Sequence, residues 1–415
     1  MLFRSDTSAV VMFKAKNDSL NPDFSKALGT YAHEEFFLMA WTTTPWTLPS
    51  NLGLTVGPDI DYVLVKTFNP YTYLPINVVL AKALIGKYFK AEAENLEFES
   101  YKEGDKLIPW RIVASFKGKD METTGYEQML PFEANSISKI QEETPGAQPF
   151  RVIVGDFVTT EDGTGIVHTA PAFGADDYRV GKKNNIGILT LVDKQGKFVE
   201  GVGEFSNRYV KNYKDEADYA DVNVDISVKL KKENRAFKVE KYEHSYPHCW
   251  RTDKPIIYYP LDAWFIKTTA AKERMVELNK TINWKPASTG TGRFGNWLEN
   301  MVDWNLSRSR YWGTPLPIWR TEDGAEVKCI GSVEQLRSEL KKSLDAGCWS
   351  SEKNAEEGIV DAAENAGSSG NGGRTGAFNT RTTPPRTHKT NWERQEIGGR
   401  HPVDSFFKKS LAGTS

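Results

Sequence analysis

The chain has 415 residues, and its 53 Lys and Arg against 55 Asp and Glu leave a net charge of −2. This balance excludes a histone-like polycation but not a local basic groove for nucleic acid. Apolar residues make up 39% and aromatic residues 12% of the sequence, which excludes a fully disordered chain. At roughly 150 residues per domain, the length predicts about two to three domains.

Cysteine content and hydropathy limit the compartment and the cofactors. Cys249, Cys329 and Cys348 are too far apart for a Cys-x-x-Cys pair, so we expect neither a metal site nor a disulfide framework. No apolar run approaches the roughly 18 residues of a membrane span, and the N-terminus lacks a signal-peptide core. The composition therefore predicts a cytoplasmic protein that does not enter a membrane.

The first half of the chain is predicted to be rich in β-strands. Runs of β-branched and aromatic residues, separated by Gly, Pro, Asn and Asp, occur at 9–13, 35–41, 62–65, 111–116 and 150–154. Such spacing is typical of a barrel-like or mixed β domain with a few helices. A helical repeat of apolar residues predicts one helix over 76–89, and a second is expected over 175–184.

The remaining chain changes character three times. Residues 211–235 are dense in Lys, Asp and Glu, which favours a solvated helix. Trp, Tyr and Pro then crowd into 245–251 and 303–313, which indicates a second domain or its docking segment. From about 343 the sequence becomes rich in Gly, Ser and Thr. It cannot bury a core there, so a disordered or out-of-frame tail is predicted.

A threonine-rich segment over 41–51 is the first candidate for chemistry. Thr42, Thr43, Thr44 and Thr47 lie within six residues, between an apolar strand and a turn that contains Pro45. Each hydroxyl can donate one hydrogen bond and accept others, and a proline-fixed turn is a rigid platform for such groups. The alternative is a strand edge followed by a loop, in which threonine serves only as a strand former.

A second segment, over 163–178, joins a histidine to two carboxylates. A glycine-flanked strand ends at His168, a Pro and Gly turn follows, and Asp176 and Asp177 stand at a predicted helix start. Carboxylates are favoured in the first turn of a helix by the free N–H groups and the dipole. The alternative is therefore that the carboxylates only cap the helix and that the histidine is structural.

The two segments together resemble the editing domain of isoleucyl-tRNA synthetases, which are class I aminoacyl-tRNA synthetases. The resemblance runs in order from about residue 5 to about 332 and includes the stretches 155–162, 248–251, 264–267, 292–298 and 307–319. Valine and leucine relatives usually carry Thr-Thr-Arg-Pro where this chain has Thr-Thr-Thr-Pro at 42–45. The threonine at position 44 therefore favours the isoleucine branch.

The resemblance implies an α+β fold, with three regions in an internal fragment of a longer enzyme. A β-barrel-like editing domain with flanking helices would occupy 1–240, and 241–335 would return to an incomplete, Rossmann-type class I catalytic domain. The tail would cover 343–415. The family's two ATP-contacting strings, His-x-Gly-His and Lys-Met-Ser-Lys-Ser, do not occur in the sequence. ATP and Mg are therefore expected only in the full-length enzyme, and editing is expected to need no cofactor.

The family's activity implies a division of labour. The full enzyme attaches isoleucine to its tRNA, and its synthetic pocket rejects valine by only about 1–3 kcal/mol, a range for which this family is itself the standard example. A second site would therefore hydrolyse mischarged valyl-tRNA(Ile) and exclude isoleucine by size. The expected partners are the acceptor end of tRNA(Ile) and the valyl ester, bound by a monomer that does not activate isoleucine alone.

The family's residue roles can be carried over where the motifs match. Asp177 matches the residue that holds the α-ammonium group of the misacylated amino acid, and Asp176 is interpreted as a helix cap. His168 matches the wall of the side-chain pocket that blocks the isoleucyl group. These matches imply a catalytic role for Asp177 and a substrate-binding role for His168.

The same resemblance assigns the threonine-rich segment to the terminal adenosine and the attacking water. The threonines at 42–44 match that wall; Thr43 and Thr44 are expected to be catalytic and Thr42 to bind substrate. Thr47 and Asn51 are expected to support the pocket, and Trp46 packs either against the acyl group or in the core.

Other functions remain open from the sequence. They are the editing domain of a valyl- or leucyl-tRNA synthetase, a free-standing deacylase, and a non-catalytic tRNA-binding module. The last would use the basic and aromatic residues Arg308, Arg310, Tyr311 and Trp312 for stacking and phosphate contacts.

Overall fold

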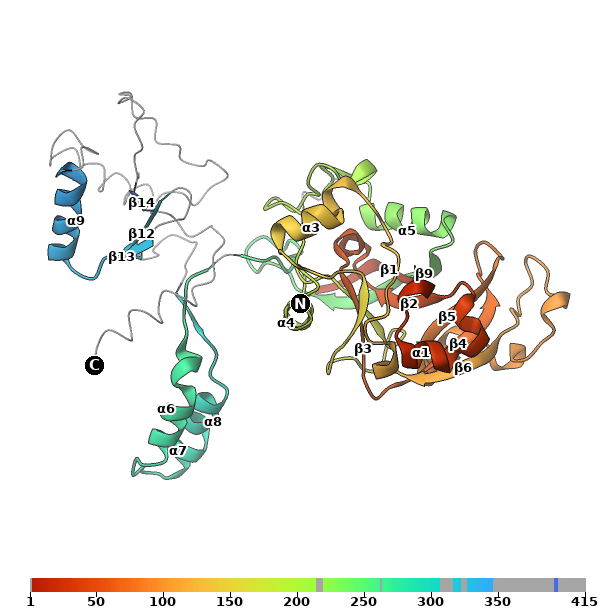
Figure 1. The fold of residues 1–415 in the computed structure, drawn as a ribbon, viewed down its shortest axis with the longest axis horizontal. Coiled ribbons are helices and arrows are strands. Elements are labelled where there is room, and N and C mark those ends of the chain that lie inside the picture. Colours follow the sequence, from red (N-terminus) through yellow and green to blue (C-terminus); the bar gives the residue numbers. More distant parts are fainter. Residues whose placement is uncertain are drawn as a thin grey trace. The chain divides into compact units, whose positions relative to one another are not determined.

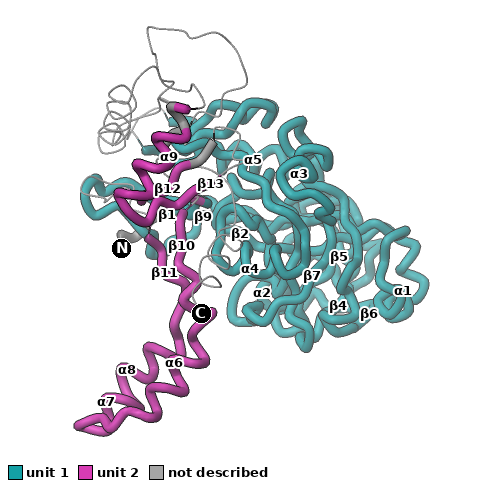
Figure 2. The backbone as a smooth tube through the Cα atoms, turned by 60° about the vertical axis from the view of Figure 1, so that its left-hand side comes forward, with its two compact units in different colours: residues 1–260 teal, residues 261–415 magenta. Residues whose placement is uncertain are grey.

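A computed structural model describes residues 2–213, 219–261, 263–306, 316–321, 327–345 and 392–394. The chain divides into two compact units, residues 1–260 and 261–415 (Figure 1, Figure 2). The expected boundary at residue 240 falls inside strand β9 (Ala236–Tyr246), which pairs with the N-terminal strand of the first unit.

The first unit is built on a mixed sheet of nine strands within the described residues. Their bounds are β1 (Leu2–Lys14), β2 (Phe37–Thr42), β3 (Gly53–Val56), β4 (Asp61–Phe68), β5 (Pro75–Ala81), β6 (Arg111–Lys117), β7 (Arg151–Val154), β8 (Ile166–Thr169) and β9. The order is β6-β4-β5-β2-β8-β3-β7, and β1 pairs with both β2 and β9. The five strand runs expected from the sequence and the mixed α+β class are confirmed.

Strand β2 is the branch point of this sheet. Its start, at Phe37 and Leu38, pairs in parallel with β5, whereas its end, at Trp41, pairs in parallel with β8. Along its other edge it is antiparallel to β1. Since the carboxyl ends of β2 and β8 lie side by side, the turns that follow them are brought together.

Residues 76–89 do not form the expected helix. Residues 75–81 are strand β5, and helical structure is confined to Lys82–Leu84 and α2 (Ile85–Tyr88). Ile76, Val78 and Leu80 belong to one buried cluster, whereas Val79 and Ala81 belong to another. A β-branched run that lies between two neighbouring strands is buried on both sides, and this burial outweighs the helical spacing.

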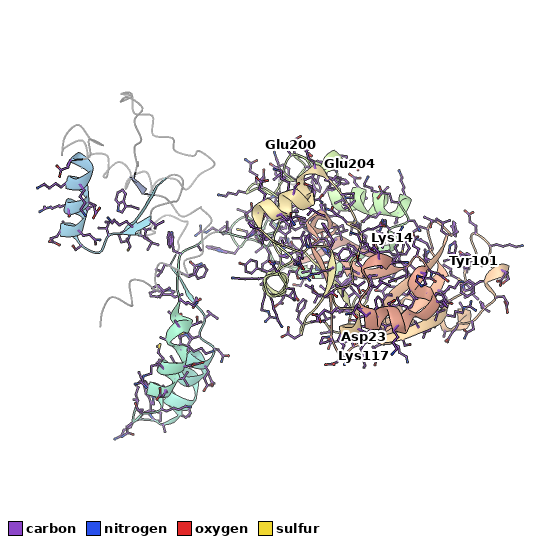
Figure 3. The ribbon with its side chains drawn as sticks, viewed as in Figure 1. Lys14, Asp23, Tyr101, Lys117, Glu200 and Glu204 are labelled. Carbon is purple, nitrogen blue, oxygen red and sulfur yellow. The ribbon has the colours of Figure 1, made fainter. Side chains whose placement is uncertain are left out.

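Helices and short 3-10 turns pack around the sheet. The α-helices of this unit are α1 (Pro22–Leu28), α2, α3 (Ile137–Glu143), α4 (Ala175–Lys183) and α5 (Val222–Lys232). The 3-10 turns are Asn17–Ser19, Gly29–His33, Pro45–Ser50, Lys82–Leu84, Ala91–Ala93, Phe98–Ser100, Gly118–Met121, Glu133–Asn135 and Gly203–Phe205. The Asn21 side chain caps α1 by accepting the N–H of Asp23, whose own side chain points to solvent (Figure 3). Helix α4 confirms the helix expected over 175–184.

The region 211–235 differs from the solvated helix expected there. Its helix, α5, begins only at Val222 and buries Val222, Ile226 and Leu230 against the core. Lys211, which precedes it, is 2% exposed. Charged residues dominate the composition of this stretch, but the apolar residues at spacings of four place one face of α5 in the interior.

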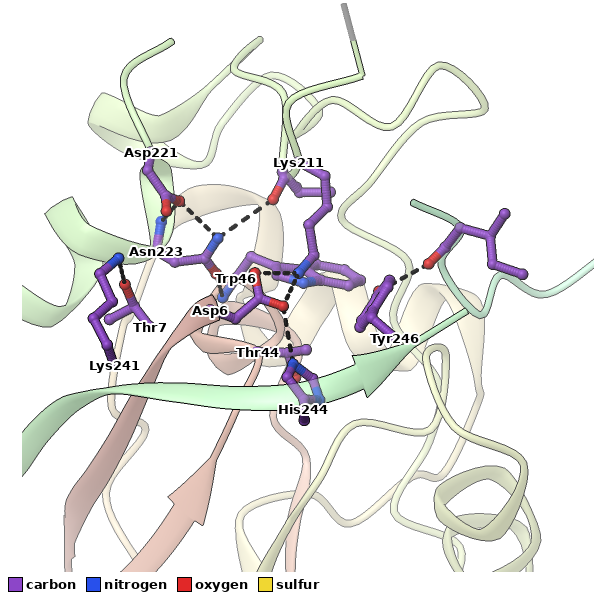
Figure 4. A network of polar contacts seen from close by, with 12 residues as sticks. Asp6, Thr7, Thr44, Trp46, Lys211, Asp221, Asn223, Lys241, His244 and Tyr246 are labelled. Carbon is purple, nitrogen blue, oxygen red and sulfur yellow. Dashed lines mark hydrogen bonds and ion pairs between the residues drawn. The ribbon is translucent and has the colours of Figure 1, made fainter. Parts of the chain in front are cut away.

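Lys211 belongs to a buried charged cluster that joins distant parts of the first unit. Its Nζ lies 3.2 Å from both carboxylate oxygens of Asp6 on β1, and His244 Nε2 on β9 lies 3.1 Å from Asp6 Oδ2 (Figure 4). The ammonium group also lies 4.5 Å from the ring centre of Tyr246. The cluster therefore joins the segment that precedes α5 to strands β1 and β9.

Asp6→Ala is expected to lower the free energy of unfolding by about 3–5 kcal/mol, because it removes one partner of a buried ion pair. Urea denaturation followed by tryptophan fluorescence measures this loss. The control is Asp61→Ala on β4, whose ion pair with Lys117 at 2.8 Å is solvent-exposed; we expect a loss of about 1 kcal/mol or less. Equal losses in the two variants would contradict the structural role given to Asp6.

In its described residues, the second unit contains a short helical cluster and two small sheets. Its helices are Thr268–Ala271, α6 (Lys272–Asn279), α7 (Ser288–Thr291), α8 (Arg293–Glu299) and α9 (Val333–Asp345). Its strands are β10 (Phe265–Ile266), β11 (Trp304–Asn305), β12 (Ile318–Thr321), β13 (Val327–Cys329) and β14 (Trp392–Arg394). Asn279 joins the helices by donating to the carbonyl of Gly290 at 2.8 Å.

Two expectations fall mainly outside the described residues. Positions 307–315, which include Arg308, Arg310, Tyr311 and Trp312, lie there, as does most of the tail from 343. Within that tail, the described residues are the end of α9 and the short strand β14. No helix in the described ranges is long and apolar enough to span a bilayer.

Candidate active site

A cavity of 360 Å³ lies where the segments after β2 and β8 meet. Of the candidate residues, the structure places Thr42, Thr43, Thr44, Thr47, His168 and Asp177 in its lining. Asn51 and Trp46 stand behind this lining. The two motifs are joined because β2 and β8 are parallel neighbours, with Trp41 opposite Val167.

The threonine-rich turn is held by its own hydroxyl groups. Thr42 Oγ1 accepts the backbone N–H of Thr44 at 3.0 Å, and the Thr47 hydroxyl donates to the carbonyl of Thr44 at 2.8 Å. Pro45 begins the 3-10 turn Pro45–Ser50 that follows. Thr43 also lines the cavity and is partly exposed, and its hydroxyl makes no hydrogen bond to the described part of the chain. It is therefore available to a ligand or a water molecule.

His168 is a neutral wall of the cavity. The Asn51 amide donates to His168 Nδ1 at 2.8 Å, and His168 Nε2 lies 2.9 Å from Thr47 Oγ1. Since the Thr47 hydroxyl already donates to a carbonyl, Nε2 carries the proton and donates to Thr47. Burial lowers the pKa of His168 to about 3. Both ring nitrogens are engaged, so the imidazole is not available as a general base.

Asp177 is a buried carboxylate of the cavity, whereas Asp162, at its edge, is exposed and pairs with Lys87. Asp177 stands in the first turn of α4, and its Oδ2 accepts the N–H of Ala170 at 2.8 Å. Burial raises the pKa of Asp177 to about 6, opposed by that hydrogen bond and reinforced by the nearby Asp176. A Cβ at Gly174 would lie 3.1 Å from Asp177 Cγ, so glycine leaves room for the carboxylate.

Asp176 differs from its neighbour in both exposure and partners. Its side chain is exposed and lies 3.2 Å from Arg179, one turn further along α4. It does not line the cavity. The structure thus places the two carboxylates in different environments, and Asp177 alone of the two faces the cavity.

Trp46 supports the cavity from behind. It is 3% exposed and packs edge-to-face on Phe173, with ring centres 4.8 Å apart, and Phe173 lines the cavity. Its backbone N–H donates to Asn223 Oδ1 of α5 at 3.0 Å (Figure 4). Of the two positions left open by the sequence, the structure shows Trp46 in the core.

Metal chemistry has no candidate in the described part of the chain. Nowhere in those residues do three or more His, Cys, Asp or Glu side chains cluster so that they could hold a metal ion. The cavity instead offers hydroxyl groups, the carboxylates of Asp162 and Asp177, and an aromatic wall formed by Trp41, Phe157 and Phe173.

Comparison with known proteins identifies the family. Residues 91–366 match the family model described as tRNA synthetases class I (I, L, M and V). The chain belongs to this family of class I tRNA synthetases. The resemblance seen in the sequence is thereby confirmed at the level of the family.

Curated relatives of this class I synthetase chain are named isoleucine–tRNA ligase. The protein of Cytophaga hutchinsonii is 60% identical over 365 residues, covering 82% of this chain and 31% of the relative. That of Bacteroides fragilis is 51% identical over 384 residues, covering 86% of this chain and 32% of that relative. The chain thus spans about a third of the length of these relatives. Their names agree with the isoleucine branch indicated by Thr44.

Solved structures of two leucyl-tRNA synthetase domains are also similar to this class I synthetase chain. GlLeuRS-CP1 is 14% identical with a TM-score of 0.30, covering 43% of this chain and 63% of that one. The editing domain of the P. knowlesi cytosolic leucyl-tRNA synthetase is 11% identical with a TM-score of 0.31, covering 43% and 62%.

Two supporting residues of this class I synthetase site escaped the sequence analysis. Asn223 lies in the charged stretch expected to be solvated, and Tyr126, which donates to Asn51, lies in a segment without a motif. No periodicity marks either residue. The aromatic residues Phe157 and Phe173 lie inside stretches that the resemblance did include.

Proposed function

We propose that the cavity hydrolyses the ester of valyl-tRNA(Ile) and spares isoleucyl-tRNA(Ile). The observation that carries this proposal is the meeting of the threonine-rich turn, His168 and Asp177 on one 360 Å³ cavity. A volume of this size is typical of a small-molecule pocket. Membership of the class I synthetases supplies the tRNA-linked aminoacyl ester as the substrate class.

Asp177 is the group that would bind the α-ammonium of the amino acid. One of its oxygens accepts the N–H of Ala170, which fixes the carboxylate at the wall of the cavity. A charge-assisted hydrogen bond to an ammonium group is roughly twice as strong as a neutral one. Because the site is partly desolvated, this contact orients the ester as well as binding it.

The hydrolysis would use an oriented water molecule. Water adds through its oxygen to the ester carbonyl carbon, the carbon–oxygen bond to the ribose breaks, and the ribose oxygen leaves with a proton. Thr43 and Thr44 offer hydroxyls that can hold this water, whereas His168 has no free ring nitrogen to act as its base. Placement alone can contribute several kcal/mol to such a reaction.

Size selection would come from the rigid imidazole. His168 is held through both ring nitrogens, so it cannot swing aside to admit a longer side chain. A difference of one methylene between two substrates changes their relative binding free energy in such a pocket by about 1–3 kcal/mol, as isoleucyl-tRNA synthetases themselves illustrate. We therefore propose that His168 sets the upper limit at a valyl group.

The direct test compares the two esters. The full chain is incubated with tRNA(Ile) carrying radiolabelled valine or isoleucine, and the amino acid remaining on acid-precipitated tRNA is measured. We expect valyl-tRNA to be hydrolysed at least about tenfold faster than isoleucyl-tRNA. Hydrolysis of valyl-tRNA at the spontaneous rate would contradict the proposal, and equal cleavage of both esters would contradict the size limit.

The pKa of Asp177 predicts a pH dependence. Only the ionised carboxylate binds an ammonium ion, and the pKa of about 6 places half ionisation near that pH. The kcat/KM for valyl-tRNA, corrected for spontaneous hydrolysis, is expected to rise about tenfold per pH unit below pH 6 and to level off above pH 7. A profile that stays flat between pH 5 and pH 7 would exclude Asp177 as the ammonium ligand.

The longer relatives suggest the wider setting. We propose that this site serves an enzyme that attaches isoleucine to tRNA(Ile) with ATP and Mg, and that residues 241–335 return to its catalytic domain. Neither ATP-contacting string occurs in the sequence. The groups proposed to act in the hydrolysis are the side chains of the cavity and a water molecule.

A further inference from the structure

A chain of four hydrogen-bonded side chains runs from the core to the cavity. Tyr126 Oη donates to Asn51 Oδ1 at 2.6 Å, and the Asn51 amide donates to His168 Nδ1 at 2.8 Å. His168 Nε2 then donates to Thr47 at 2.9 Å, and Thr47 donates to the carbonyl of Thr44 at 2.8 Å. Only the last two side chains line the cavity.

The direction of this chain is fixed at its inner end. Tyr126 is fully buried, and burial raises the pKa of its hydroxyl well above the ordinary value of 10, so it stays protonated and serves as a donor. The Asn51 amide also donates to the carbonyl of Gly53 at 2.9 Å. A donor on one side and an acceptor on the other allow a single orientation of the amide.

The orientation of Asn51 then dictates the proton position on the imidazole. Because Asn51 presents N–H groups to His168, Nδ1 must be the acceptor and Nε2 must carry the proton. The alternative tautomer would place two donors face to face at Asn51 and leave two acceptors at Thr47. An unmatched buried polar group costs about 1–3 kcal/mol, so these hydrogen bonds hold His168 in one tautomer and one ring position.

We propose that Tyr126 is a positioning residue that, through Asn51, locks His168 as the Nε2–H tautomer and so fixes the wall that limits the size of the substrate. The inference rests on the proposed hydrolysis for its functional part. Tyr126 itself does not line the cavity. Its ring is held edge-to-face between Phe13 and Phe150, with ring centres 5.3 and 6.2 Å away.

Two substitutions perturb this series of hydrogen bonds at different points. Tyr126→Phe removes the donor to Asn51 Oδ1 and keeps the ring, so the Asn51 amide loses one of the contacts that fix its orientation. Asn51→Asp replaces the N–H groups with a carboxylate that can only accept, which draws a proton onto His168 Nδ1. Tyr71→Phe is the matched control, because the Tyr71 hydroxyl accepts an N–H from Val239 on β9 at 2.8 Å and takes no part in the chain.

Nitrogen-15 NMR of the full chain labelled at histidine reads the tautomer, with His168→Gln as the assignment variant. We expect a proton on Nε2 alone in the parent chain and in Tyr71→Phe. In Asn51→Asp we expect a proton on Nδ1, and in Tyr126→Phe a second population protonated there. In Tyr126→Phe the ratio of valyl- to isoleucyl-tRNA hydrolysis should fall by about fivefold or more.

A Tyr126→Phe chain that keeps the single Nε2–H tautomer and the parental ratio, even with a lower melting temperature, would show that Tyr126 only stabilises the fold. If the tautomers shift as expected while the parent chain hydrolyses no valyl-tRNA, the hydrogen-bond chain holds and the proposed function fails. The two failures are therefore distinguishable.

Discussion

Asp177→Ala is expected to lower kcat/KM for valyl-tRNA hydrolysis by roughly 30-fold to several thousand-fold at pH 7.5. Removing one partner of a desolvated charge pair costs about 2–5 kcal/mol, and 1.4 kcal/mol corresponds to a factor of ten. At that pH the carboxylate, with a pKa of about 6, is ionised and available to the ammonium group. Deacylation kinetics on labelled valyl-tRNA measure the loss.

Asp176→Ala is the matched control for this prediction. Asp176 neighbours Asp177 on α4, but its side chain is exposed and pairs with Arg179, so we expect a change of less than about twofold, in line with the small effect of surface ion pairs. Asp177→Asn adds a second comparison, because it keeps an acceptor for the Ala170 N–H and removes the charge. Wild-type kinetics in Asp177→Asn would show that the carboxylate's charge is not required.

His168→Ala is expected to admit isoleucyl-tRNA as a substrate. The imidazole occupies the wall of the cavity, and its removal opens space for one further methylene. The ratio of valyl- to isoleucyl-tRNA hydrolysis should fall from at least about tenfold to near unity. The variant also leaves Thr47 and Asn51 without their partner, so it should lose about 1–3 kcal/mol of stability.

His168→Gln separates volume from imidazole chemistry. A glutamine amide can still accept from Asn51 and donate to Thr47 while it fills most of the ring's space. We expect this variant to keep most of the preference for valyl-tRNA. If His168→Gln lost hydrolysis of valyl-tRNA altogether, the histidine would be a participant in the reaction rather than a wall.

Strands β1, β2, β4, β6 and β7 could be predicted because each contains a short run of β-branched and aromatic residues bounded by turn formers. Strand β5 could not, because the run over 76–89 satisfies a helical repeat as well as an alternating one. Its position between β4 and β2 favours the strand over the helix. That position depends on pairing with distant strands, which no local pattern encodes. The buried face of α5 was missed for a related reason, since its three inward-facing apolar residues lie in a stretch dense in Lys, Asp and Glu.

The candidate site, too, could be predicted from the sequence only in part. Thr43, His168 and Asp177 stand in short motifs, and the resemblance to an editing domain is enough to join the two motifs in one site. The supporting residues carry no such signal, because Tyr126 reaches Asn51 across 75 positions and Asn223 reaches Trp46 across 177. Such contacts arise only when the sheet closes. A buried tyrosine in a loop without a motif therefore gives no sign of its role in the sequence.

The most direct test of the central claim is a crystal structure of the full chain with a non-hydrolysable adenosine analogue that carries valine through an amide bond. The account predicts the valyl ammonium within hydrogen-bond distance of Asp177, the side chain against His168, and the carbonyl carbon facing the hydroxyls of Thr43 and Thr44. A valyl group bound outside the cavity, or one whose ammonium contacts no oxygen of Asp177, would contradict it.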